Sequence, residues 1–163
     1  MFTLKKISPA AISAALAKAD KYRLLNEPSQ AESICRDVLA VDPQNQPALV
    51  TLVLALTDQF DARSQAGVRH AETALAEVKS EYQHTYYDGI IRERWAMALL
   101  RDGDPGHQAW EWLREAMRAY EKAEPLAPAG NSDPILRWNS CARVIARKGL
   151  SERSEQPSMM EGD

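Results

Sequence analysis

The chain has 163 residues, a formal net charge of −3 and 26% charged residues, which is the size and composition of one globular domain. The slight acidic excess argues against a general nucleic-acid binder, because such proteins usually carry more Lys and Arg than Asp and Glu. No apolar run approaches the roughly 20 residues that a membrane-spanning helix needs, so we expect no membrane association.

Helix signals begin close to the first residue. Ser8-Pro9 predicts a helix start, because serine caps a helix and proline suits its first position. That helix should run to about residue 25, and a second helix is expected over 29–41, where Asp42-Pro43 ends it. Residues 5–17 also resemble a secretory signal, but a proline and a serine interrupt their apolar run, so we favour the helix.

Two further pairs of helices follow. The second pair is expected over 47–58 and 64–79, joined by a loop that is longer than the first turn. The third pair is expected over 85–101 and 106–123, and the turn between them is dense in Asp, Gly and Pro, which break helices.

A single helix closes the ordered part of the chain. Asp133-Pro134 predicts its start, and Arg147, Lys148 and Gly149 suit its last turn and its end. From residue 150 the sequence has no hydrophobic periodicity, so we expect a disordered tail over 150–163.

The helices of each pair carry different but recurring spacings of apolar residues. In both spacings the residues stand three or four apart, which places them on one face of a helix. The later helix of each pair carries the triplets Ala31, Cys35, Val38; Ala71, Leu75, Val78; and Ala109, Leu113, Ala116. The earlier helices and the final one carry Ala15, Ala19, Tyr22; Leu49, Leu52, Val53, Leu56; Trp95, Ala96, Leu99; and Trp138, Cys141, Ala142, Ile145.

This pattern resembles the tetratricopeptide repeat, a helix–turn–helix unit of about 34 residues. Tyr22, Ala31 and Pro43 fall at the family's aromatic, alanine and proline positions. Trp138 stands where the family's first helix carries its tryptophan. The second and third repeats depart from the pattern, because they lack the terminal proline in register.

The resemblance implies an all-α fold, an α-α right-handed superhelix of about seven antiparallel helices. Its domain would span 8–149, with repeats at about 8–45, 46–83 and 84–124 and a capping helix at 134–148. Such stacked hairpins form a concave face, so the resemblance implies a non-catalytic scaffold that binds a peptide or a partner protein there. Stacked ends also leave homodimer formation open.

The family's groove positions can be carried over to this sequence. They fall on polar residues of the first helix of each pair and of the final helix, and the later half of the set is mainly basic. A partner with acidic side chains or a free carboxylate would suit it, because guanidinium pairs with carboxylate through two hydrogen bonds. The alternative is a solvated charged face. The positions are Asp20, Arg23, Thr51, Asp58, Glu93, Arg94, Arg101, Asn139, Arg143 and Arg147.

Two tryptophans form a second candidate. Trp110 and Trp112 stand two apart on one predicted helix and therefore point in different directions. At least one of them should be partly exposed, where it would serve as an interface anchor. The alternative is that both flank the core.

Other chemistry finds little support in the sequence. Cys35 and Cys141 occupy inward positions, which indicates small buried hydrophobes in a reducing, cytoplasmic compartment. The histidines show no paired ligand spacing, and no phosphate loop or nucleophile elbow is present, so we predict no enzyme activity, metal or cofactor. The basic final helix makes a nucleic-acid accessory role the main alternative function. A helical metal-binding enzyme is the second and less favoured alternative.

Overall fold

A computed structural model describes residues 1–152 of the chain. This part is all-α, as predicted: it contains seven α-helices and two short 3-10 turns, and residues 1–152 include no strand. Most of the predicted tail, from residue 153 onward, lies outside the described residues.

The first four α-helices are α1 (Ile12–Leu24), α2 (Pro28–Val41), α3 (Gln46–Thr57) and α4 (Ala66–Ala76), and a 3-10 turn, η1 (Pro9–Ala11), precedes them. Asn45 caps α3, since its side-chain oxygen accepts the N–H of Ala48 at 3.0 Å. These bounds agree with the pairing expected from the proline and cap signals.

The remaining helices are α5 (Glu81–Arg101), α6 (His107–Ala123), η2 (Glu124–Leu126) and α7 (Asp133–Lys148). α5 begins earlier than the predicted residue 85, because the Ser80 hydroxyl accepts the N–H of Gln83 at 3.2 Å and caps it there. Gly149 ends α7 with a φ of 62°, in the left-handed region that glycine adopts freely.

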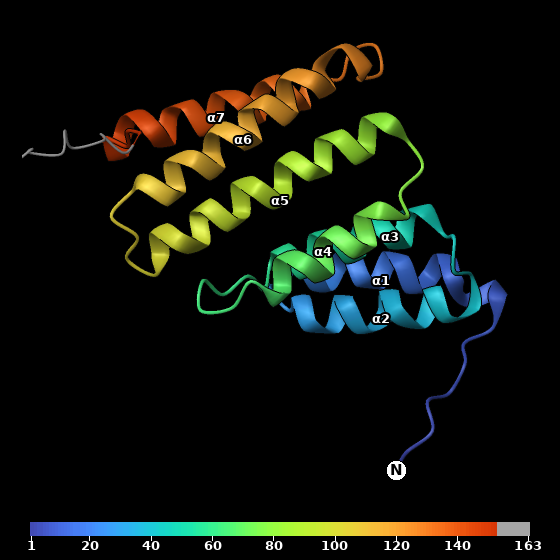
Figure 1. Ribbon diagram of the computed structural model, residues 1–163. Coiled ribbons are helices and arrows are strands. Elements are labelled where there is room, and N and C mark those ends of the chain that lie inside the picture. The colour runs from blue at the N-terminus through green and yellow to red at the C-terminus, as the bar shows by residue number, and fades with distance from the viewer. Residues whose placement is uncertain (153–163) are drawn as a thin grey trace, which may run out of the picture.

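Each helix packs against the one that follows it, and α3 also contacts both α1 and α5. Figure 1 shows α1 to α4 gathered below, with α5, α6 and α7 lying together above them. The first helices of the three pairs are therefore neighbours in space although they are far apart in the sequence.

Two apolar clusters hold the helices together. The first lies among α1 to α4 and one side of α5, and the second lies among α5, α6 and α7. All nine residues of the three later-helix triplets are buried, as their spacing predicts. Cys35 and Cys141 are also buried, and burial raises the pKa of each thiol to about 12. Leu150, just past α7, still packs against the second cluster.

α5 and α6 approach most closely at a glycine. A Cβ placed on Gly89 would lie 2.5 Å from the ring of Tyr120, which is 1% exposed. The hydroxyl of that tyrosine donates to the buried carboxylate of Glu93 at 2.6 Å. Burial of the ring and the hydrogen bond at its hydroxyl hold the ring in place, so it has little room to move aside.

We expect the substitution Gly89→Ala to destabilise the fold. Alanine favours a helix by about 1 kcal/mol over glycine, but overpacking a fixed ring costs about 1–3 kcal/mol, and the packing loss should win. Urea unfolding would show a lower midpoint. Adding Tyr120→Val removes the ring, so the double variant should lose less than the sum of the single changes, and simple additivity would contradict the account.

Candidate functional site

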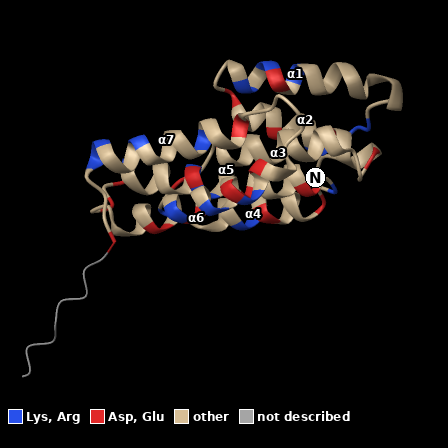
Figure 2. Ribbon diagram, turned by 90° about the horizontal axis from the view of Figure 1, so that it is seen from above, with Lys and Arg blue, Asp and Glu red and all other residues tan. Residues whose placement is uncertain are grey.

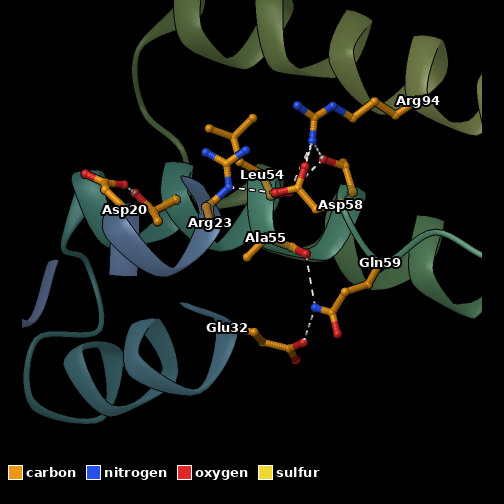
Figure 3. A network of polar contacts seen from close by, with 10 residues as sticks. Asp20, Arg23, Glu32, Leu54, Ala55, Asp58, Gln59 and Arg94 are labelled. Carbon is orange, nitrogen blue, oxygen red and sulfur yellow. Dashed lines mark hydrogen bonds and ion pairs between the residues drawn. The ribbon is translucent and has the colours of Figure 1, made fainter. Parts of the chain in front are cut away.

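A row of polar contacts joins α1, α3 and α5 (Figure 3). The carboxylate of Asp58, at the end of α3, accepts the Nε–H of Arg23 from α1 at 2.8 Å. Its other oxygen accepts from the guanidinium of Arg94 on α5, which also donates to the Thr57 hydroxyl at 2.9 Å. The three charged side chains are only 20–24% exposed, so one half-buried carboxylate ties three helices together.

The row continues toward the start of α1 and α3. The hydroxyl of Thr51 donates to Asp20 at 3.3 Å, and Thr51 itself is 8% exposed. Five of the predicted groove residues, from three helices, therefore lie together along this row. Their side chains bond mainly to one another, which leaves little of their charge for a partner.

Glu93 lies elsewhere. It is 8% exposed and bonds to Tyr120 and to Arg137, whose guanidinium donates to it at 3.3 Å. Successive helical residues point about 100° apart, so Arg94 faces α3 while Glu93 turns toward α6 and α7. The structure thus places this predicted groove residue in the interior, where it holds α7 to α5.

The remaining predicted groove residues keep open side chains. Arg101, Arg143 and Arg147 are exposed, Asn139 is partly buried, and none of their side chains has a hydrogen bond or ion pair within residues 1–152. Figure 2 shows basic residues spaced along α7. Only Arg101 belongs to a helix of the Asp58 row.

An open depression of about 470 Å³ lies where α3 and α5 end. Asp58 and Arg101, both predicted groove residues, stand on its wall. Asp61 and Arg63 also line it, and the bonded Arg63 guanidinium lowers the pKa of Asp61 to about 2. Two cations line the depression. Arg63 is paired with Asp61, whereas Arg101 has no acidic partner in the described chain. The other lining residues are Gln59, Phe60, Ala62, Ala98 and Asp102.

The sequence reading did not assign a role to the loop that walls this depression. Phe60 through Arg63 belong to the segment between α3 and α4, which follows no helical period. The unusual length of that loop was the one available signal, because long loops often carry binding residues.

The two tryptophans differ in their surroundings. Trp112 is partly buried, meets Trp95 edge to face at 6.5 Å and packs against both apolar clusters. Its outer side lines a pocket of about 410 Å³ together with Arg92, Glu111 and Glu115. Trp110 is also partly buried. Trp112 is therefore chiefly a flank of the core.

Two kinds of site are absent from the described residues. Residues 1–152 hold no group of three His, Cys, Asp or Glu side chains placed to bind a metal ion. No helix within that range combines the length and apolar character needed to cross a membrane.

Comparisons with known proteins give no match from which a function could be transferred. No protein-family model matches the sequence, and no curated protein or solved structure matches it either. The resemblance to the tetratricopeptide repeat therefore stays a prediction.

We expect Asp58→Ala to lower stability by about 1–2 kcal/mol, because it removes charged hydrogen bonds and leaves two arginines facing each other. Arg101→Ala, at an exposed position without a partner, should change the free energy of unfolding by less than about 0.5 kcal/mol. Chemical denaturation of both variants measures the difference. Equal stability of the two would show that the Asp58 row contributes nothing to the fold.

Proposed function

We propose that this protein is a non-catalytic interaction module of the tetratricopeptide-repeat kind. In this proposal its paired helices stack as a right-handed superhelix, and a peptide or partner protein binds along the face that α1, α3 and α5 share. Contact between these alternate helices supports the stacking, because a solenoid needs each unit to rest on the next.

The single observation behind the proposal is the row centred on Asp58. Residues that the family pattern assigns to one face, on three separate helices, do adjoin one another through Asp20–Thr51 and Arg23–Asp58–Arg94 contacts. These two sets of contacts form a polar strip across the helices rather than a set of isolated surface charges. A strip of that kind suits an extended polypeptide lying across the helix axes.

The chemistry of the partner follows from what the row leaves unpaired. Arg23 and Arg94 are already bonded to Asp58, so they offer structure rather than charge. Arg101 lines the depression whose wall also includes Asp58, and its guanidinium has no bonded partner within residues 1–152. We infer that an acidic side chain or a C-terminal carboxylate of the partner pairs with Arg101.

Selection from a random peptide library, followed by fluorescence anisotropy on the selected peptides, tests this function. We expect peptides rich in Asp or Glu, or dependent on a free carboxylate. Arg101→Glu should weaken them about tenfold or more, since it replaces attraction with repulsion, and tenfold corresponds to about 1.4 kcal/mol. Lys122→Glu, the same charge change at the far end of α6, is the matched control and should alter binding less than about twofold.

Three results would contradict the proposal. The library could yield no specific binder, Arg101→Glu could bind as well as the wild type, or Lys122→Glu could weaken binding equally. Circular dichroism of both variants checks that each retains the helical fold, so a loss of binding reports on the site.

A further inference from the structure

A second pocket adjoins the depression and differs from it in chemistry. It has a volume of about 350 Å³ and shares Ala62 and Asp102 with the depression. Its wall comes from four places: the loop between α3 and α4, the helix α5, the turn between α5 and α6, and Gln108 in the first turn of α6. Trp95 and Asp104 both line it.

Trp95 brings an unused donor to this pocket. The side chain is 1% exposed, and its ring is held edge to face by Phe60 at 5.8 Å and by Trp112 at 6.5 Å. Its indole Nε1 is buried and has no hydrogen-bond partner within residues 1–152. A buried donor without a partner lowers stability by about 1–3 kcal/mol, so a hydrogen-bond acceptor at this atom would be favourable.

Asp104 brings an unused acceptor. One carboxylate oxygen accepts the N–H of Gly106 at 2.8 Å and the N–H of Ala109 at 3.2 Å, and so caps the start of α6. The other oxygen, Oδ1, is buried and has no partner in the described chain. Residues 1–152 contain just two buried side-chain polar atoms without a partner, and both belong to residues of this pocket.

We propose that this pocket binds an amide group. The amide oxygen would accept from Trp95 Nε1, and the amide N–H would donate to Asp104 Oδ1. An indole N–H can only donate and a carboxylate can only accept, so the ligand must present one acceptor and one donor together. An amide does this with fixed geometry, whether it belongs to a peptide backbone or to an Asn or Gln side chain.

The inference deepens the proposed function, because it names the group read in one subsite of the same cleft. Both protein atoms are held in place beforehand, the indole by its aromatic neighbours and the carboxylate by its capping bonds. Each of the two atoms has less than 1 Å² of exposed surface, so the pocket has to widen slightly before an amide can reach them. The open Arg101 and the amide subsite would then select an acidic residue and a neighbouring amide on one peptide.

Titration of ¹⁵N-labelled protein with small amides, followed by the indole N–H signals, tests the subsite without a peptide. The chain has four tryptophans, so triple-resonance assignment identifies the signal of Trp95. We expect N-methylacetamide to shift that signal saturably, with a Kd on the order of millimolar. N,N-dimethylacetamide keeps the acceptor but lacks the N–H, so it should bind at least about tenfold more weakly.

Two variants assign the donor contact to Asp104. Asp104→Asn keeps an oxygen to cap α6 but presents an NH₂ group where the unused oxygen stood, so N-methylacetamide should bind at least about tenfold more weakly. Glu124→Gln removes one negative charge just past the far end of α6, outside both pockets, and should change the affinity less than about twofold. Acetamide, which resembles an Asn or Gln side chain, is titrated in parallel. If acetamide binds more tightly than N-methylacetamide, the natural ligand group is an Asn or Gln side chain. If it binds more weakly, the ligand group is a backbone amide.

Equal binding of the two methylated amides, or an unchanged affinity in Asp104→Asn, would overturn the proposal. A Trp95 signal that does not respond to any amide would overturn it as well, and would indicate that water fills the pocket. These outcomes are separate from the library selection: amide binding without selected peptides contradicts the proposed function alone, and selected peptides without amide binding contradict this subsite alone.

Discussion

The structure depends on one helix that is buried on two sides. α5 places Ile91, Trp95 and Ala98 in the first apolar cluster and Ile90 and Ala96 in the second. A helix between two clusters cannot rotate to improve one contact without losing the other, because the interior is close-packed. α5 therefore sets the position of the helices before it relative to those after it. Its last turn also supplies Ala98 and Arg101 to the depression at which we place the partner.

Some polar side chains of α5 hold neighbouring helices in place, and another remains open to a partner. Glu93 ties the helix to α6 and α7, while Arg94 ties it to α3 through Asp58. Breaking either pair would leave a buried or half-buried charge without its partner, which is the expensive outcome for such groups. The open cation, Arg101, comes about two helical turns after Arg94, at a level where the neighbouring helix α3 has ended. The residue that we assign to binding, Arg101, thus lies at the end of α5, beyond the helix that packs against it.

Much of the fold could be predicted from the sequence, because its causes are local. Proline and cap residues placed the helices, and the spacing of Ala31, Cys35 and Val38 identified a buried face. The family positions also brought Arg23, Asp58 and Arg94 into one set before their contacts were known. Glu93 was misplaced because one residue turns a helix by about 100°, and only the packing of α5 decides which neighbour that side chain meets. The amide pocket could not be predicted, since it needs a loop and a turn whose shapes follow no period.

The central claim is that a partner binds along the face that α1, α3 and α5 share and places an acidic group at the depression where α3 and α5 end. Hydrogen exchange of the protein, with and without a saturating selected peptide, measures this most directly. The account predicts that protection rises in the loop over 58–65 and in the turn over 101–106, while the outer surface of α6 and the end of α7 exchange as before. Protection confined to α6 and α7, or unchanged exchange at a saturating peptide concentration, would contradict it.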